Sequence, residues 1–305
     1  MEPEQELLKD VAPLEEYSVP FENVLVRQAH SPGHFYSPDI DPDELALRQN
    51  EVWPATPRPM LGVVFDDDQH RAVLTDLFPR FMPDYDFVEK EDQVENDYQF
   101  YTQNSQYSWM DSRATFVLLR AWQPKRIIEV GSGFSSLLMA DINRRFRNLE
   151  CDITCIEPYP RPFLKAGVPG ITHLIEEKVQ TVSLSTFDTL EAGDVLFIDS
   201  SHVSKTGSDV NYLLFEVLPR LKVGVKIHFH DIFFPHDYPK DWVLGEARSW
   251  NEQYVLRALL MYSTAFEVVY GNLYAFHAMP DLVKQALAHP KGYAYGGSSL
   301  WIERT

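Results

Sequence analysis

The sequence predicts an α/β protein built on a doubly wound, mostly parallel β-sheet. The apolar run 126–130 passes through a glycine-containing turn at 131–133 into a helical stretch at 137–146, which gives the order strand, turn, helix. The run 194–199 is almost continuously apolar, as in a strand that helices cover on both faces. From residue 111 onward strand patterns alternate with helix patterns, and this alternation favours parallel strands joined by helices.

The first hundred residues are rich in proline and acidic residues and show helical patterns only in places. Asp41 followed by Pro42 is a typical helix start, and the apolar spacing at 72–78 predicts an amphipathic helix. We therefore expect an α-rich N-terminal extension, residues 1–105, that acts as a lid on a second domain, residues 106–305.

Beyond residue 105 each apolar or periodic run is assigned to one element. The expected helices lie near 111–121, 137–146, 184–190, 208–221, 251–263 and 281–288. The expected strands lie near 126–130, 152–156, 172–182, 194–199, 225–230, 266–276 and 299–303. Ligands of such sheets bind at the carboxyl ends of the parallel strands, so we look there for functional residues.

Length and charge limit the classes of partner. At 305 residues the chain can form one elaborated domain or a core with an appendage. A formal net charge of -18 and an isoelectric point near 4.9 argue against nucleic acid or an anionic membrane as a partner, because both need clustered Lys and Arg. No apolar run approaches the ~20 residues of a membrane span, and the start lacks the pattern of a signal peptide. We therefore expect a cytoplasmic location.

The two cysteines, Cys151 and Cys155, are four residues apart on an expected strand. About 13 Å then separates their Cα atoms, too far for a disulfide. We interpret Cys155 as a small core residue and Cys151 as an ordinary residue at the end of the strand.

The glycine turn predicts a nucleotide site. Gly131 and Gly133 are expected to supply positive backbone dihedrals and to let a ligand approach the main chain, while the free amides at the helix start attract polar or anionic groups. Glu157 closes the next strand, where a βαβ unit places a carboxylate that binds ribose hydroxyls.

Polar residues follow two further strands and are expected to converge at one edge of the sheet. Asp199 and His202 follow one strand, and His230 and Asp231 end the other. With an unperturbed pKa near 6.5, His202 is the side chain that we expect to act as general base. His228 shares a face with His230 about 6.7 Å deeper, so we interpret it as a hydrogen-bonded core histidine.

Aromatic residues surround these strand ends in the sequence. They could form an apolar wall for a ring-shaped acceptor, although helix packing explains each of them singly. The residues are Tyr101, Tyr107, Trp242, Trp250 and Tyr254. His236, Asp237 and Tyr238, in the proline-flanked loop 234–239, could likewise belong to an acceptor pocket or pack as a loop.

The segment Glu129-Val130-Gly131-Ser132-Gly133, with acidic residues at the later strand ends, resembles the class I S-adenosylmethionine-dependent methyltransferases over about residues 100–305. The segments 197–202 and 227–231 resemble a bacterial subgroup related to metal-dependent O-methyltransferases and cephalosporin-hydroxylase-like proteins, which is associated with polysaccharide or natural-product tailoring. The resemblance implies a Rossmann-like sheet of seven strands whose last strand is antiparallel.

The resemblance also implies S-adenosyl-L-methionine as the cofactor. Its methionine part would face Gly131 and Gly133, its ribose Glu157 and its adenine Gln180. The cofactor-binding set is Glu129, Gly131, Ser132, Gly133, Ser135, Glu157, Gln180 and Asp199. Ser135 stands where the family has a third glycine, and Ser136 stands where a nicotinamide-type pattern needs glycine, which weakens a dehydrogenase more than a methyltransferase.

In the metal-dependent branch a divalent cation holds the acceptor oxygen. By position its ligands would be Asp199, His230 and Asp231. A mixed set of nitrogen and oxygen ligands suits Mn, Fe or Zn as well as Mg, which prefers oxygen alone. The catalytic residues would be His202, Asp231 and Lys205, the last as a substrate clamp.

These observations favour methyl transfer to a hydroxyl of a small molecule or sugar, with His202 or a metal generating the nucleophile. One alternative is an iron-dependent oxygenase-like enzyme that uses His202, His230 and a carboxylate. Another is a non-catalytic protein that binds S-adenosylmethionine and serves as a partner subunit. The sequence leaves open whether the chain forms a homo-oligomer.

Overall fold

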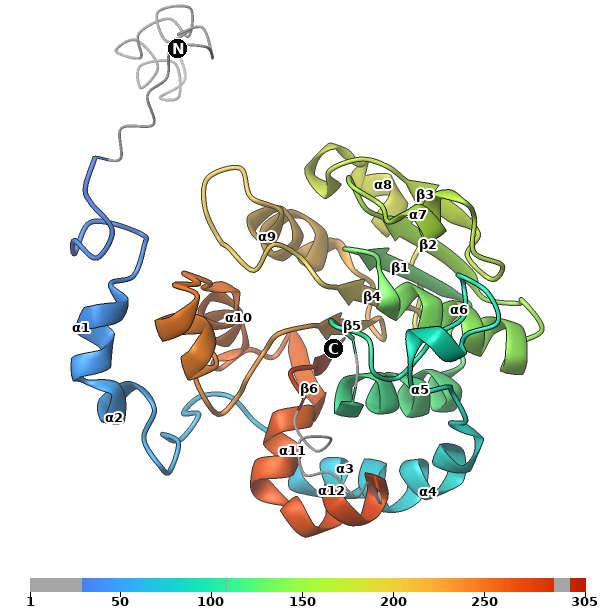
Figure 1. The fold of residues 1–305 in the computed structure, drawn as a ribbon, viewed down its shortest axis with the longest axis horizontal. Coiled ribbons are helices and arrows are strands. Elements are labelled where there is room, and N and C mark those ends of the chain that lie inside the picture. Colours follow the sequence, from blue (N-terminus) through green and yellow to red (C-terminus); the bar gives the residue numbers. More distant parts are fainter. Residues whose placement is uncertain (1–28, 108, 288–296) are drawn as a thin grey trace, which may run out of the picture.

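A computed structural model describes residues 29–107, 109–287 and 297–305 and contains a seven-stranded sheet (Figure 1). The strand order is β3-β2-β1-β4-β5-β7-β6. All pairs from β3 to β5 are parallel, whereas β7 runs antiparallel to both of its neighbours. The strands are β1 Arg126–Val130, β2 Asp152–Ile156, β3 His173–Ile175, β4 Val195–Ile198, β5 Lys226–Phe229, β6 Phe266–Gly271 and β7 Leu300–Arg304. The doubly wound sheet and its antiparallel last strand are therefore confirmed.

Both faces of the sheet are buried, which explains the continuous apolar runs. Ile127 of β1 and Phe197 of β4 pack into one apolar core, whereas Ile128 and Leu196 pack into another on the opposite face. Successive side chains of a strand point to opposite faces, so a strand covered on both sides needs apolar residues throughout.

Helices form a layer on each side. The first core contains residues of α4, α5, α6, α7, α11 and α12, and Figure 1 shows α3, α4, α11 and α12 grouped below α5. The second core contains residues of α8, α9 and α10. The helices are α1 Pro42–Leu47, α2 Gln49–Val52, α3 Asp67–Ala72, α4 Phe78–Phe81, α5 Trp109–Trp122, α6 Phe134–Phe146, α7 Pro162–Lys165, α8 Leu184–Phe187, α9 Asp209–Tyr212, α10 Glu252–Leu260, α11 Asn272–Ala278 and α12 Pro280–Leu287.

Local signals explain several helix starts and ends. The side chain of Asp41 accepts hydrogen bonds from the amides at the start of α1, and that of Asp66 does the same for α3. The π-helical turn Val73–Leu77 joins α3 to α4, and Leu213–Val217 extends α9 in the same way. The helices predicted at 72–78 and 208–221 therefore exist as continuous segments of mixed helix type. Residue 288, the expected end of the helix at 281–288, lies outside the described residues.

Two predicted strands are too long. The strand expected at 172–182 ends at Ile175, because the charged residues 176–178 follow on a short edge strand, and a 3₁₀ turn forms at Val179–Thr181. The strand expected at 266–276 ends at Gly271, and α11 begins at once. There the backbone amide of Asn272 donates a hydrogen bond to the carbonyl of Ser299. No local sequence pattern connects these two residues.

The described part of the N-terminal extension divides in two. Helices α1 and α2 lie at the margin of the molecule (Figure 1), where Trp53 donates to the carbonyl of Tyr238 at 2.8 Å. The π-helical turn Val73–Leu77 and helix α4 instead contribute Leu74 and Phe78 to the first core. A lid formed by residues 1–105 stays a prediction, and residues 1–28 of it lie outside the described residues. Among the described residues, no helix combines the length and apolar character that crossing a bilayer requires.

Candidate active site

A cleft of about 880 Å³ opens at the carboxyl ends of the parallel strands. The glycine turn after β1, Glu157 after β2, residues 199–202 after β4 and residues 230–231 after β5 all line it. The edge predicted to bind ligands is therefore hollowed, and the predicted polar residues share one cavity.

Gly131 has to be glycine for a structural reason. Its φ is +81°, and a Cβ placed on it would lie 1.8 Å from the carbonyl oxygen of Asp199. The turn after β1 therefore touches the backbone after β4. The prediction that Gly133 has a positive φ is wrong, because its φ is -167°, which is extended backbone. A Cβ there would meet only the Nε of Arg161, at 3.9 Å, so Gly133 leaves open space beside the cleft.

The Glu129 side chain holds the residues that follow the glycine turn through hydrogen bonds. Its carboxylate is fully buried and accepts hydrogen bonds from Ser135 Oγ at 2.6 Å, from Ser136 Oγ, and from Cys155 Sγ at 3.2 Å. Burial raises the pKa of Glu129 to about 7, although the serine hydrogen bonds oppose that rise. Both cysteines are free and buried, so the predicted core role of Cys155 is confirmed.

The Glu157 carboxylate is fixed by two backbone amides. Ser132 N donates to Oε2 at 3.2 Å and Tyr159 N donates to Oε1 at 2.8 Å. Each oxygen keeps a further lone pair, so the carboxylate can still accept hydrogen bonds from a diol. Ser132 and Glu157 thereby join the turn after β1 to the end of β2.

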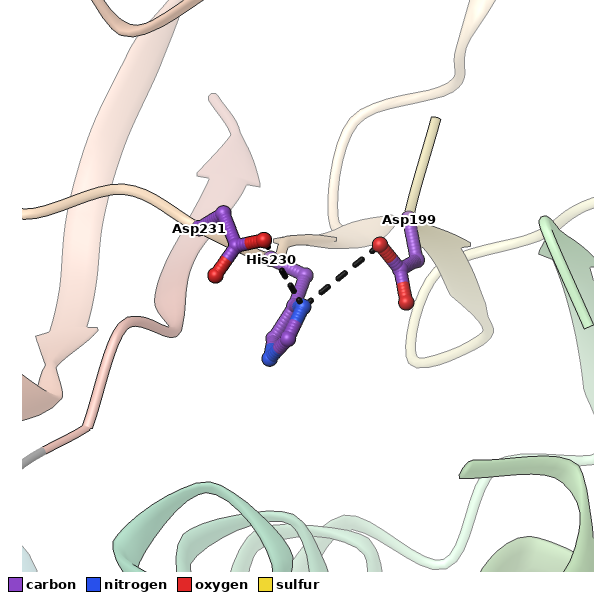
Figure 2. Close-up of side chains that lie close together, drawn as sticks. All are labelled: Asp199, His230 and Asp231. Atoms are coloured by element: carbon purple, nitrogen blue, oxygen red, sulfur yellow. Dashed lines mark ion pairs between the residues drawn. The ribbon is translucent and has the colours of Figure 1, made fainter. Parts of the chain in front are cut away.

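Asp199, His230 and Asp231 converge at the ends of β4 and β5 (Figure 2). Nδ1 of His230 lies 3.5 Å from Oδ1 of Asp199 and 3.7 Å from Oδ2 of Asp231. One ligand atom from each residue lies within 4.8 Å of the others. Asp231 has a positive φ of 56°, and Ser298 Oγ donates to its Oδ1 at 2.9 Å. The donor set and spacing fit a divalent cation.

His202 joins this cluster from the loop after β4, with a φ of 61°. Its Nδ1 lies 2.8 Å from Oε2 of Glu252, and its Nε2 lies 3.4 Å from Asp199 and 3.5 Å from Asp231. Burial alone lowers the pKa of His202, but hydrogen bonds and charges from Asp199 and Glu252 outweigh burial and raise it to about 10.

Asp111 of α5 lies behind His230. Its Oδ2 is 3.8 Å from Nε2 of His230, and its Oδ1 accepts hydrogen bonds from Asn272 Nδ2, Ser298 N and Ser299 N at 2.7–2.9 Å. Burial opposes ionisation of Asp111, yet His230 and these hydrogen bonds hold the pKa of the carboxyl below its usual range. Burial lowers the pKa of His230, but the negative charges of Asp231 and Asp199 outweigh this effect and raise it.

A family model described as a methyltransferase domain matches residues 128–232, the segment that contains the glycine turn, Glu157 and the strand-end cluster. The chain belongs to the S-adenosylmethionine-dependent methyltransferases. The methyltransferase is also 33% identical over 165 residues to a protein of Archaeoglobus fulgidus described as uncharacterized, a match that covers 52% of this chain and 73% of the relative. The enzyme therefore uses S-adenosyl-L-methionine, and the family match favours methyl transfer over the oxygenase and non-catalytic alternatives.

Solved structures with a similar fold include two methyltransferases that contain S-adenosylhomocysteine. The Podospora anserina methyltransferase PaMTH1 is 17% identical, with a TM-score of 0.39 over 86% of this chain and 94% of that one. Coclaurine N-methyltransferase is 11% identical, with a TM-score of 0.32 over 86% and 92%. At TM-scores this low, the two similarities give no further information about the order of the strands in the sheet.

Three predicted site residues of the methyltransferase lie outside the cleft lining: Glu129, which is buried behind the turn after β1, Gln180 and Lys205. Gln180 donates from Nε2 to the carbonyl of Gly207 at 3.1 Å. Lys205 is exposed on the loop after β4, where its amide donates to Ser208 Oγ at 3.1 Å. His228 is fully buried, bonds to Ser299 Oγ at 2.9 Å and stacks on Phe197, so its predicted role as a core histidine is confirmed.

The far side of the cleft is aromatic. Phe233, Trp242 and Trp250 line it, and the Arg248 guanidinium lies 4.1 Å from the Trp242 ring and 4.6 Å from that of Trp250. Tyr107 lines the cleft as well. Tyr101 and Tyr254 do not, and His236, Asp237 and Tyr254 line a separate pocket against the N-terminal extension.

Sequence reasoning missed Asp111 and Glu252. Each is a buried acid in the first turn of a helix, far along the chain from the histidine it faces. Their positions alone gave a weak signal, because acids in the first turn are common for reasons of helix polarity.

Proposed function

We propose that the methyltransferase transfers the methyl group of S-adenosyl-L-methionine to a hydroxyl of a small acceptor, a sugar or natural product. The observation that carries this proposal is the Asp199–His230–Asp231 cluster, which shares one cleft with the glycine turn. Cofactor and acceptor oxygen would then meet in the same cavity, and catalysis would depend mainly on proximity and orientation.

The cofactor would lie over the turn after β1. Gly133 leaves room for its methionine part, and the fixed Glu157 carboxylate is available to its ribose hydroxyls. We retain Ser132, Ser135 and Asp199 as cleft-lining contacts. Glu129 would act through the turn that it supports, and Gln180 would need its side chain to leave Gly207.

A divalent cation would be held by Asp199, His230 and Asp231. The fit is supported by the 3.5 and 3.7 Å spacings from the His230 nitrogen, which are longer than charge-assisted hydrogen bonds. A set that includes imidazole suits Mn, Fe or Zn better than Mg. When bound, the cation would lower the pKa of the acceptor hydroxyl and fix its orientation.

The chemical step is an in-line displacement. The acceptor oxygen forms a bond to the methyl carbon, the carbon–sulfur bond breaks, and the sulfur keeps the electron pair as S-adenosylhomocysteine leaves. Nε2 of His202 already faces two carboxylates, so we assign the hydroxyl proton to Asp231. Ser298 holds the other oxygen of Asp231 in place.

The cleft lining supports a small, ring-bearing acceptor. Phe233, Trp242 and Trp250 offer flat apolar surfaces. The acids Asp111, Glu157, Asp199 and Asp231 line the same cleft, and such a surface repels a phosphate backbone. A nucleic-acid acceptor is therefore disfavoured.

Calorimetric titration with S-adenosylmethionine and S-adenosylhomocysteine tests the cofactor site. We expect micromolar binding by the wild-type protein and at least about tenfold weaker binding by Glu157→Ala, because a charge-assisted contact to the ribose is lost. Glu150→Ala, at an exposed position before β2, is the matched control and should bind normally. Absence of binding to metal-replete wild-type protein would contradict the proposal. Hydroxylated sugars and phenols would then be screened with labelled cofactor, with and without EDTA pretreatment.

A further inference from the structure

A second imidazole belongs to the strand-end cluster. Nε2 of His202 and Nδ1 of His230 both face Oδ1 of Asp199 and Oδ2 of Asp231. The four nitrogen-to-oxygen distances are 3.4, 3.5, 3.5 and 3.7 Å. Two imidazole nitrogens and two carboxylate oxygens therefore alternate around one point.

The spacing of this ring is that of atoms that share a cation. Direct charge-assisted hydrogen bonds draw nitrogen and oxygen to about 2.7–2.9 Å, and none of the four contacts is that short. Two ligand atoms that each lie about 2.1 Å from one metal, at angles near 90–110°, are separated by about 3.0–3.5 Å. The four contacts are therefore closer to the spacing of metal ligands than to that of hydrogen bonds. Asp199, His230 and Asp231 already bring one ligand atom each within 4.8 Å of the others, and His202 would complete the set by moving its Nε2 towards them.

The ring of His202 is held from its outer side. Nδ1 pairs with Glu252 at 2.8 Å, and Ser200 Oγ donates to the other oxygen of that carboxylate at 3.1 Å. Glu252 is 1% exposed, and the amides of Asn251 and Glu252 both donate to the carbonyl of His202. The Trp250 ring covers the imidazole at 4.3 Å. With Nδ1 engaged, only Nε2 is left to the cluster.

On the opposite side the outer nitrogen of His230 also faces a buried carboxylate, that of Asp111, but at 3.8 Å, which is beyond hydrogen-bond distance. Both imidazoles thus present one nitrogen to the shared point and the other to a buried carboxylate. Metal-bound histidines usually have such a carboxylate on the outer nitrogen, which fixes the tautomer and the ring orientation.

We propose that His202 is a fourth metal ligand, that Glu252 is its positioning residue, and that the set of two imidazoles and two carboxylates selects manganese, iron, cobalt or zinc over magnesium. This inference rests on the proposed metal-assisted function, and it replaces the general-base role expected for His202. Magnesium prefers six oxygen ligands in octahedral geometry, whereas imidazole suits the later first-row metals.

Counting the bound imidazoles tests the inference without turnover. Protein freed of metal with EDTA is loaded with copper(II), and pulsed electron paramagnetic resonance reports the number of coordinated imidazoles. Wild-type protein should show two, and His202→Asn should show one. One imidazole in wild-type protein would overturn the proposal, and this measurement needs no variant to fold.

Metal affinity provides the second measurement. Calorimetric titration with cobalt(II) should give affinities about 10- to 100-fold weaker for His202→Asn and Glu252→Gln than for wild-type protein. His173→Asn, at an exposed position on β3, is the matched control and should bind cobalt as wild-type protein does. Unchanged cobalt affinity in His202→Asn would overturn the proposal.

Titration of the same samples with S-adenosylmethionine separates this inference from the proposed function. Two imidazoles in a protein that does not bind the cofactor would contradict the proposed function and leave the ligand assignment intact. Normal cofactor binding with one imidazole would contradict the ligand assignment alone.

Discussion

The two halves of the cleft are built in different ways. The cofactor half, formed by the ends of β1 and β2, is held by contacts within one βαβ unit, such as Ser132 N to Glu157 and Ser135 Oγ to Glu129. The cluster half, formed by the ends of β4 and β5, depends on Glu252 and other residues distant in the chain. A site made from one βαβ unit is encoded locally, whereas a site made between units requires the completed fold.

The largest effect on stability is expected from a substitution at Gly131, where the cofactor half of the cleft contacts the cluster half. Gly131→Ala would push a Cβ to 1.8 Å from the Asp199 carbonyl at a positive φ, so we expect a loss of about 4 kcal/mol or more in the free energy of unfolding. Urea denaturation measures it. Gly133→Ala is the matched control, since its Cβ has room, and it should lower cofactor affinity while the fold survives. Equal stability of the two variants would contradict the contact.

Next is Asp231→Asn, which removes the proposed proton acceptor and, at the same time, a carboxylate proposed to hold the cation. We expect kcat/KM to fall about 10³-fold, because a positioned base contributes factors of this order, while S-adenosylmethionine binding stays normal. Kinetics with the acceptor found by screening, together with calorimetry, separate the two halves. Asp152→Asn, exposed at the start of β2, is the control. A parallel loss of cofactor affinity in Asp231→Asn would show that the halves are not separable.

Glu129→Gln tests the support beneath the turn through the dependence of stability on pH. The pKa of Glu129 is raised from 4.5 to about 7 in the folded protein, so its favourable contribution is complete below pH 4.5 and is lost as pH rises through 7. Between pH 5 and pH 8 the wild-type protein should lose about 3 kcal/mol relative to Glu129→Gln. Urea denaturation across this range checks it, and identical pH profiles would contradict the raised pKa.

The smallest effect is expected on the aromatic side. Trp242→Ala should raise the KM for the acceptor about tenfold, because a stacking surface is lost, and should leave cofactor affinity unchanged. Tyr262→Ala, at a residue that is 81% exposed and does not line the cleft, is the control. An unchanged KM would remove Trp242 from the acceptor site.

The contrast between the halves also explains what the sequence could predict. The sheet was predictable because strands buried on both faces read as continuous apolar runs, and its antiparallel strand followed from the family resemblance. The convergence of Asp199, His230 and Asp231 was predictable because each residue directly follows a parallel strand.

Other features depended on tertiary contacts. The end of β6 is set by Asn272 bonding to Ser299, and the need for Gly131 is set by the backbone of Asp199. No periodicity or motif in the sequence predicts such pairs of contacting residues. The environment of His202 likewise required Glu252, from a helix fifty residues further along the chain.

The backbone at His202 and Asp231 has a consequence for protein engineering. Both residues adopt left-handed conformations, with φ of 61° and 56°, which cost a residue with a Cβ about 1 kcal/mol or more. Glycine would relieve this cost, but at position 202 it would also leave the buried Glu252 carboxylate without its imidazole partner. Selection for thermal tolerance alone would therefore not favour replacing His202, and the strained backbone is retained together with the side chain that it positions.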